Sequence, residues 1–415
     1  MSGAAQSRRV LGFVALGTLL ASLGSAVAGT LNINANTSDP APRAAWEAVI
    51  SSFRRDNPDV EVKFNIFDHE SYKKSIRNWL TSASPDVVFW FVGNRMREFV
   101  SRGLLADVSS LFTAKVQSEL HSPAVSLVTV GGKQYGVPYS YYQVGFYFRR
   151  DLLERAGVTE APRTWNDLRA ACDKLQRSGI DAFAIGSKDL WPTAAWFDYL
   201  NLRTNGHTFH MELMRGLIPY TNERVRNVFA RWRELLDAGC FTKNHASVSW
   251  QESQSLLYQG KAAIMLIGNY IVPNFPAEVR DRMDFAPFPT IDPAVGRFED
   301  APMNSIHIPA NARNKEDARR FLAYVLRADV QEAINKRILL LPVNLKAETA
   351  DDRFLKKGQE LLMQADAFAQ YFDRDTSEDL ATVAMKGFQE FMINPGRLEA
   401  VLETIERARR RIYRF

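Results

Sequence analysis

The order of apolar and polar residues near the start of the chain predicts three strands separated by two helices. Residues 31–36, 60–67 and 87–92 alternate or run apolar over the length of a strand, whereas residues 44–54 and 72–80 place apolar side chains on one helical face. A βαβαβ order predicts a parallel sheet with right-handed crossovers. The chain is therefore expected to be an α/β protein.

The same patterning continues over the rest of the chain without an internal repeat. Thr164 and Asp167 have the spacing of a capping box that begins a helix. Residues 222–238 and 315–326 have helical periodicity, and residues 260–270 predict a strand and the turn that follows it. A chain of 415 residues exceeds what one hydrophobic core usually supports, so two lobes are expected.

The first 28 residues have the composition of a secretory signal peptide. Arg8 and Arg9 precede an apolar run over residues 10–23, and residues 26–28 read Ala-Val-Ala, the small-residue pattern of a cleavage site. The apolar run is too short for a membrane anchor, and no later segment has the apolar length of a membrane helix. We expect a protein that is secreted to the periplasm.

Charge and cysteine content exclude several other classes. The formal net charge of +5 falls to +3 without the two arginines of the signal peptide, so nucleic acid is not an expected partner. The basic run at residues 407–414 is expected to solvate a helix end. An oxidising compartment permits Cys172 and Cys240 to pair, and two buried thiols are the alternative. His207 and His210 lack the glutamate and the spacing of a zinc motif, so no metal is expected.

The segment that follows residues 87–92 carries candidate binding chemistry. A buried parallel strand ends there, and open α/β sheets bind ligands at the carboxyl ends of their strands. Trp90 offers a flat apolar face, while Asn94 and Arg95 offer hydrogen-bond donors in fixed geometries. This combination suits a sugar. The alternative roles are a core tryptophan for Trp90 and a helix N-cap for Asn94.

This segment resembles the corresponding stretch of the maltose-binding protein and its relatives, the extracellular sugar-binding proteins of ABC importers. Trp90 and Arg95 match the family's Trp and Arg if one residue is inserted, and Asn94 stands where the family has an acid. The similarity covers nearly the whole mature chain. Other segments resemble the family and occur in the same order as in its members: residues 103–105, 132–138, 164–165, 260–265, 315–321 and 341–342. Phe148-Arg149 departs from the family, which usually has Tyr-Asn at this place.

The resemblance implies the type II periplasmic binding protein fold. In that fold each of two lobes has a mainly parallel sheet flanked by helices, and the chain crosses between the lobes three times. The crossings are expected near residues 138–142, 268–271 and 304–309. Lobe 1 is then expected to contain residues 29–139 and 271–309, and lobe 2 residues 140–270 and 310–415.

The resemblance also implies a binding site in the cleft between the lobes. Tyr270 falls where the family supplies a stacking ring, Tyr142 lies where the first crossing reaches the cleft, and Asp189 and Trp191 match a Glu-x-Tyr pair that contacts sugar. Trp196, Asn269 and Asn304 are expected from their proximity to matched positions. The predicted ligand-binding residues are Trp90, Asn94, Arg95, Tyr142, Asp189, Trp191, Trp196, Asn269, Tyr270 and Asn304.

The expected function is the periplasmic substrate-binding component of an ABC sugar importer. As a monomer, it would capture a di- or oligosaccharide and deliver it to the membrane permease. The sequence has no catalytic motif and no phosphate-binding loop, so neither an enzyme activity nor a cofactor is expected. One alternative is a secreted carbohydrate-active hydrolase with two carboxylates across a cleft. Another is ferric iron binding by Tyr141 and Tyr142. Neighbouring residues of a strand point to opposite faces, which argues against the iron site.

Overall fold

The first five elements of the structure are those that the apolar pattern predicts. Strand β1 pairs in parallel with both β2 and β3, so the βαβαβ unit is confirmed. The apolar face of helix α1, which includes Trp46 and Phe53, is buried against this sheet. The bounds are Leu31–Ala35 for β1, Pro40–Asp56 for α1, Val62–Ile66 for β2, His69–Thr81 for α2 and Val87–Phe91 for β3.

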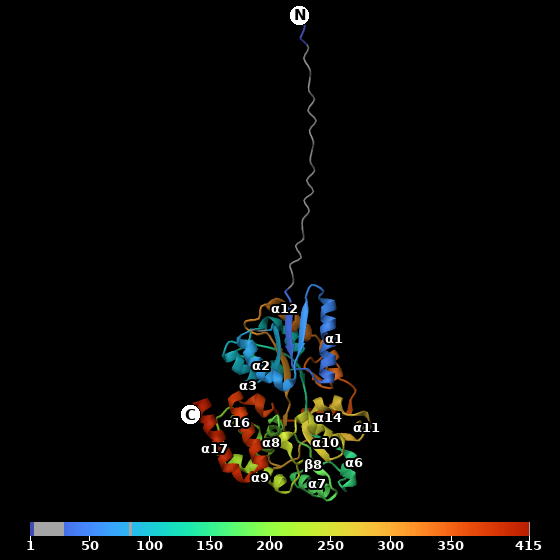
Figure 1. Ribbon diagram of the computed structural model, residues 1–415, viewed down its shortest axis with the longest axis vertical. Helices are drawn as coiled ribbons and strands as arrows, with labels where there is room; N and C mark the ends of the chain where they lie inside the picture. Colours follow the sequence, from blue (N-terminus) through green and yellow to red (C-terminus); the bar gives the residue numbers. More distant parts are fainter. Residues whose placement is uncertain (4–28, 83–84, 415) are drawn as a thin grey trace.

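Figure 1 shows these elements in the upper of two lobes. The computed structural model describes residues 1–3, 29–82 and 85–414. The core of the expected signal peptide lies outside the described residues. Among the helices in the described ranges, none combines the length and the apolar character that a membrane crossing requires.

The sheet of lobe 1 has six strands in the order β13-β6-β12-β3-β1-β2. Helix α13 packs on α1, and α12 packs near β6. Two short strands, β4 and β5, form a separate hairpin. The remaining bounds in this lobe are Asn94–Ser101 for α3, Ser109–Leu111 for η1, Ala114–Ser118 for α4, Ser122–Leu127 for α5, Thr129–Val130 for β4, Lys133–Gln134 for β5, Val137–Tyr141 for β6, Met303–His307 for β12, Lys315–Val325 for α12, Ala328–Ile338 for α13 and Leu341–Pro342 for β13.

The sheet of lobe 2 has four strands in the order β10-β7-β9-β8, and helices surround it. Thr164 and Asp167 form the predicted capping box at the start of α7. The strands are β7 (Val144–Arg149), β8 (Asp181–Phe183), β9 (Ala262–Gly268) and β10 (Met283–Ala286), with β11 (Phe298–Asp300) paired to β14 (Ala367–Ala369). The helices are α6 (Arg150–Arg155), α7 (Trp165–Arg177), α8 (Trp191–Met214), α9 (Glu223–Asp237), η2 (His245–Ser247), α10 (Trp250–Tyr258), η3 (Asn269–Asn274), α11 (Ala277–Arg280), α14 (Arg353–Met363), α15 (Phe372–Asp375), α16 (Glu378–Ile393), η4 (Pro395–Arg397) and α17 (Leu398–Tyr413).

Both sheets are mixed rather than mainly parallel. Strand β12 runs antiparallel to β3 and β6, and β7 runs antiparallel to β9 and β10. Strands β7 and β12 each enter their sheet directly from the other lobe. Because no crossover helix precedes them, they are free to pair in the antiparallel direction.

The chain passes between the lobes at three places. Residues 142–143 join β6 to β7, residues 301–302 join β11 to β12, and residues 343–352 join β13 to α14. The first crossing lies where it was expected, and the second lies just before the expected residues 304–309. Residues 268–271 do not cross, because η3 and β10 remain in lobe 2.

The pairing of the strands also sets lobe boundaries that differ from the expected ones. Residues 271–300 lie in lobe 2, because β10 pairs with β7 and β11 pairs with β14. Residues 310–342 lie in lobe 1, because α13 packs on α1 and β13 pairs with β6. Lobe 1 therefore comprises residues 29–82, 85–141 and 303–342, and lobe 2 comprises residues 143–300 and 353–414.

A disulfide joins Cys172 of α7 to Cys240, which follows α9. The sequence left this pairing open. The two Cα atoms lie 5.7 Å apart, and both residues are buried in lobe 2. The bond therefore fastens lobe 2 internally and leaves the motion between the lobes unconstrained.

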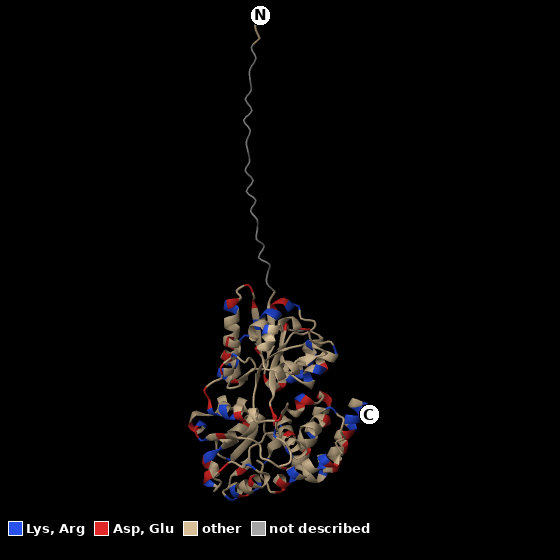
Figure 2. Cartoon of the chain, turned by 180° about the vertical axis from the view of Figure 1, so that it is seen from behind, with Lys and Arg blue, Asp and Glu red and all other residues tan. Residues whose placement is uncertain are grey.

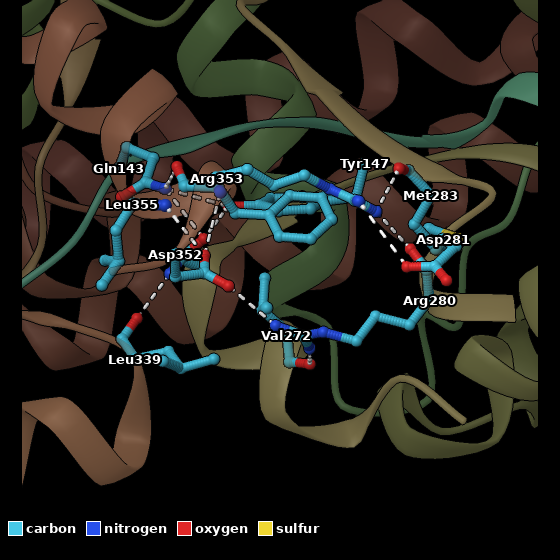
Figure 3. Close-up of polar contacts among 12 residues, drawn as sticks. Gln143, Tyr147, Val272, Arg280, Asp281, Met283, Leu339, Asp352, Arg353 and Leu355 are labelled. Carbon is cyan, nitrogen blue, oxygen red and sulfur yellow. Dashed lines mark hydrogen bonds and ion pairs between the residues drawn. The ribbon is translucent and has the colours of Figure 1, made fainter. Parts of the chain in front are cut away.

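Buried amide side chains meet at the hinge between the lobes (Figure 3). The Oδ1 atom of Asn269 accepts hydrogen bonds from Gln143 Nε2 at 2.8 Å and from the Tyr147 hydroxyl at 2.7 Å. The Nδ2 atom of Asn269 donates to the carbonyl of Leu339 in lobe 1, and Gln143 donates to the carbonyl of Phe354 at 3.1 Å. These bonds tie the end of β9 to the first and third crossings.

Helix α14 is held firmly where the third crossing ends (Figure 3). Asp352 caps the first turn of the helix and pairs with Arg280 at 2.7 Å, and Arg353 donates to the carbonyl of Arg280. Gly358 lets α14 approach the hinge closely, since a Cβ atom there would lie 2.1 Å from the side chain of Gln143. A larger residue at this position would displace the hinge amide.

Candidate functional site

A cavity of about 140 Å³ lies between the lobes, near the crossings. Its wall in lobe 1 comes from the loop after β1, the first turns of α1 and α2, and the ends of β3 and β6. Its wall in lobe 2 comes from the first turns of α8 and α10 and from η3 and α15. The site therefore lies at the carboxyl ends of the parallel strands, where α/β sheets bind ligands. The lining residues are Asn36, Thr37, Asp39, Pro42, Trp46, His69, Lys73, Phe91, Tyr139, Tyr142, Trp191, Trp250, Tyr270, Pro273, Asn274, Asn304, Ile338, Leu340, Tyr371, Asp373 and Arg374.

A larger hollow of about 900 Å³ lies on lobe 2, and lobe 2 alone lines it. Its wall includes the proline-rich segment 287–293 and the charged side chains of Arg150, Glu154 and Lys357. Closure of the lobes cannot act on this hollow. The interlobe cavity is the better candidate because both lobes contribute to it and because aromatic rings converge there.

Aromatic rings form much of the cavity wall. The ring centroids of Trp191 and Trp250 lie 5.8 Å apart with the planes at 60°, and those of Trp250 and Tyr270 lie 5.8 Å apart at 86°. Tyr142 meets Tyr270 at 5.3 Å and 86°. Phe91 contributes a ring from lobe 1. Because neighbouring rings stand at steep angles to one another, they enclose a space instead of forming one flat plate.

Charged groups reach the same cavity from both lobes. The guanidinium of Arg374 lies 4.1 Å from the ring centroid of Phe91 and donates to the Tyr142 hydroxyl at 3.1 Å. Lys73 of lobe 1 forms an ion pair with Asp373 of lobe 2 at 3.5 Å. Burial acts to raise the pKa of Asp373, but Lys73 and Arg374 together outweigh it and lower the pKa. Asp373 is therefore an ionised acceptor.

His69 is a neutral member of the wall. Burial, followed by the charges of Lys73 and Arg374, lowers the pKa of His69 to about 3. The amide of Asn36 lies 2.9 Å from Nδ1 of His69 and donates to it when the imidazole is neutral. The ring can therefore offer its Nε2 proton as a hydrogen-bond donor.

Four buried polar atoms on the cavity wall have no hydrogen-bond partner among the described residues. They are Thr37 Oγ1, Trp250 Nε1, Tyr371 Oη and Arg374 Nη1. A buried polar group left without a partner costs about 1–3 kcal/mol, and native structures keep few of them. A ligand with several hydroxyl groups could supply partners for all four atoms.

Four of the predicted ligand-binding residues line the cavity. Tyr142, Trp191 and Tyr270 belong to its aromatic wall, and Asn304 of β12 lies beside them. The Nδ2 atom of Asn304 donates to Ser140 Oγ at 3.1 Å, which leaves the amide oxygen available. The structure thus brings these four residues together from both lobes and the first crossing.

The predicted residues in β3 and directly after it lie outside the cavity. Trp90 is buried and packs on Phe91, with ring centroids 4.6 Å apart, and Phe91 is the ring that faces the cavity. Asn94 and Arg95 instead reach lobe 2: Asn94 donates to the carbonyl of Asp375, and Arg95 approaches Glu378 at 3.6 Å. Both residues belong to the contact between the lobes.

Three further predicted residues support the site from behind. Asp189 accepts a hydrogen bond from the backbone N–H of Trp250 at 3.0 Å and so positions the start of α10. Trp196 lies in the core of lobe 2, with its ring 4.8 Å from that of Phe183. Asn269 is occupied by the hinge network described above.

Sequence reasoning missed Phe91, Trp250 and Arg374. Phe91 directly follows the tryptophan that was chosen, and a shift of one residue exchanges the faces of a strand. The capping box of Ser249 and Glu252 was a usable signal, because it places Trp250 at the first position of a helix. Arg374 lies in α15, a helix of a single turn for which the sequence analysis found no signal.

The lobes touch beside the cavity, between α2 and α3 of lobe 1 and α15 and α16 of lobe 2. Arg77 bridges Glu98 at 3.0 Å and Glu378 at 2.7 Å. With the pairs made by Lys73 and Arg95, this contact holds the cleft closed. The two lobes are therefore in their closed arrangement.

Tyr141 and Tyr142 do not converge. The ring of Tyr141 meets His121 with centroids 5.6 Å apart, whereas Tyr142 meets Tyr270 and Arg374 at the cavity. Within the described residues no group of three or more His, Cys, Asp or Glu side chains is arranged to hold a metal ion. The arrangement gives no support to a tyrosine-based iron site.

Two α/β lobes that close on a cavity rich in aromatic rings and hydrogen-bonding groups define a solute-binding protein. The chain belongs to the family of bacterial extracellular solute-binding proteins, whose profile matches residues 35–332. Members of this family are extracellular transport components, so the protein is not an enzyme.

Similar proteins occur in several organisms. An uncharacterized ABC transporter extracellular-binding protein of Pyrococcus horikoshii is 20% identical over 71% of this chain and 67% of its own length. The osmoprotective compounds-binding protein GgtB of Synechocystis is 22% identical over 68% of this chain and 70% of its own.

Solved structures share the fold over nearly the whole chain. The bacterial solute receptor AcbH has a TM-score of 0.88 and 28% identity, and the match covers 92% of this chain and 99% of AcbH. A chitin oligosaccharide binding protein has a TM-score of 0.84 and 19% identity, over 92% of this chain and 98% of that protein.

Proposed function

We propose that this protein is the periplasmic sugar-binding component of an ABC importer, and that it binds its sugar in the interlobe cavity. The observation that carries the proposal is the wall of that cavity, where aromatic rings from both lobes stand beside polar atoms without protein partners. Sugar rings have apolar C–H faces that stack on aromatic rings and a rim of hydroxyls that need hydrogen-bonding groups. The wall offers both.

The relatives support a carbohydrate as the ligand. AcbH is described with an exclusive substrate preference for β-D-galactopyranose, and at 28% identity it is a relative in sequence as well as in fold. The relative from Pyrococcus horikoshii is an ABC transporter extracellular-binding protein. A membrane permease is accordingly the partner that we assign, with the binding protein acting as a monomer.

Within this proposal, the residues that contact sugar are Phe91, Tyr142, Trp191, Trp250 and Tyr270. The polar partners of the hydroxyls are Lys73, Asp373, Arg374 and the amide of Asn304. Trp90, Asn94 and Arg95, which the sequence favoured, act behind the wall or in the closing contact. The proposed contact residues all line one cavity, and we propose them in place of the ten ligand-binding residues predicted from the sequence.

The mechanism follows from the contribution of both lobes. Sugar favours the closed arrangement because only there do Phe91 and Lys73 of lobe 1 line the same cavity as Trp250 and Arg374 of lobe 2. Opening removes half of these contacts and releases the ligand. A micromolar dissociation constant needs a net free energy of about −8 kcal/mol, which a few stacked rings and desolvated hydrogen bonds can supply.

A thermal-shift screen of the purified protein tests the proposal. Mono-, di- and oligosaccharides are compared with amino acids at the same concentration, and we expect at least one sugar and no amino acid to raise the melting temperature. A ligand present at 100 times its dissociation constant stabilises the folded state by about 2.7 kcal/mol. Chromatography after incubation should recover the sugar intact. Stabilisation by amino acids alone, or cleavage of the sugar, would contradict the proposal.

A further inference from the structure

We infer that the cavity accepts one neutral pyranose ring and excludes disaccharides; this inference rests on the proposed function and narrows its ligand. From the sequence, a di- or oligosaccharide was the expected ligand. Volume, enclosure and charge of the closed cavity favour a single ring.

The volume is the first argument. The closed cavity encloses about 140 Å³. Sites for drug-sized ligands enclose roughly 300–1,000 Å³. The cavity therefore has less than half the volume at the lower end of that range, which favours one hexose ring over two.

The arrangement of the walls is the second argument. A long sugar chain needs an open groove with aromatic plates placed in series. Here the ring planes of Trp191 and Trp250 stand at 60° and those of Trp250 and Tyr270 at 86°. The three rings therefore surround one space instead of forming a row. From lobe 1, Phe91 lies under the guanidinium of Arg374, so the walls of the two lobes are in contact on that side.

The lobes also meet at the rim of the cavity. Lys73 and Asp373 pair across the cleft at 3.5 Å, and both side chains line the cavity. A disaccharide that extended past this point would have to break the pair. Beyond it, Arg77 and Glu378 join the same two lobes at 2.7 Å.

The charges of the wall are the third argument. The charged lining side chains are two carboxylates, Asp39 and Asp373, and two cations, Lys73 and Arg374. Their formal charges cancel, so a uronic acid or an amino sugar would bring a charge that has no free counter-charge. The same four groups offer donors and acceptors together, as neutral hydroxyls require.

Calorimetry with matched sugars on the purified protein tests this inference. D-Galactose, D-glucose, D-mannose and D-xylose are compared with lactose, melibiose, maltose and xylobiose, and with galacturonate, glucuronate, galactosamine and glucosamine. We expect at least one neutral monosaccharide to bind on the order of 100-fold more tightly than the disaccharides that contain it, and roughly tenfold or more tighter than its charged analogues.

Each result decides the matter. A disaccharide that binds as tightly as its component sugar, or a charged analogue that binds more tightly than its neutral parent, overturns the single-ring inference and leaves the proposed function standing. Failure of every sugar in the panel, with stabilisation by another class of solute, overturns both. Tight binding of one neutral monosaccharide with rejection of its disaccharides supports both.

Discussion

Two buried tryptophans offer a matched test of where the sugar lies. Trp90 and Trp250 are both buried, and the indole N–H of each has no partner among the described residues. Only Trp250 lines the cavity, whereas Trp90 packs behind Phe91. Replacing each with phenylalanine removes the same atoms from two positions that differ chiefly in their access to ligand.

The expected losses follow from these environments. In Trp250→Phe the sugar loses one neutral hydrogen bond, about 1 kcal/mol. It also loses contact with roughly 40 Å² of ring surface, about 1 kcal/mol at 25 cal/mol per Å². The sum of about 2 kcal/mol corresponds to a loss of roughly 30-fold in affinity. In Trp90→Phe neither contact exists, so affinity should change less than about twofold, while the cavity left in the core costs about 1–2 kcal/mol of stability.

Isothermal titration calorimetry with the sugar that gives the largest thermal shift measures both affinities. Chemical denaturation of the unliganded variants measures their stabilities separately, so a folding defect is not mistaken for a binding defect. Equal affinity losses in the two variants, or a loss confined to Trp90→Phe, would refute the placement of the ligand against the lobe 2 aromatic wall.

Three further outcomes are expected. In reversible denaturation, the double variant Cys172→Ser/Cys240→Ser should lose about 4 kcal/mol of unfolding free energy, because the disulfide closes a loop of 68 residues. Its sugar affinity should be retained, because the bond lies within lobe 2. An unchanged unfolding free energy would contradict this expectation. The folded-state pKa values of His69 and His210 are about 3, below the unfolded value near 6.5, so stability supplied by each neutral ring is lost as pH falls from about 6.5 toward 3. At pH 5 this costs about 2 kcal/mol per ring, and NMR should find both imidazoles still neutral in the folded protein; a charged ring at pH 5 would refute it. Glu378→Gln weakens the ion pair between Glu378 and Arg77 of lobe 1 by about 0.5–1 kcal/mol. X-ray scattering should therefore find a larger radius of gyration for the unliganded variant. An unchanged radius of gyration would contradict a role of this ion pair in closing the lobes.

The βαβαβ start of the chain could be predicted because its signal is local. Residues 31–92 carry strand and helix periods that each element satisfies with its own side chains, and the structure repeats them within one or two residues at most ends. The capping box at Thr164 is equally local and is present. The length of the chain predicted two lobes, and the family resemblance supplied their fold and the cleft between them, which no periodicity in the sequence encodes.

The finer details depend on contacts between distant segments. Whether Trp90 or Phe91 faces the cavity is a matter of one residue in register, and the packing of Trp90 against α3 decides it. The crossing expected at residues 268–271 failed because β10 adds to the edge of the lobe 2 sheet beside β7. The short turn that carries Asp373 and Arg374 has too few residues for a periodic signal.

The ion pairs around Arg77 are made between protein side chains alone, so they favour the shut form even without cargo. Their side chains are partly exposed, and dissolved salt screens such pairs, with a Debye length of about 30 Å at 0.01 M and about 3 Å at 1 M. The salt concentration outside the cell therefore affects how often the unliganded protein is closed. In dilute medium the unliganded protein closes more often, so it meets its importer more often without a ligand, and each such encounter can waste ATP.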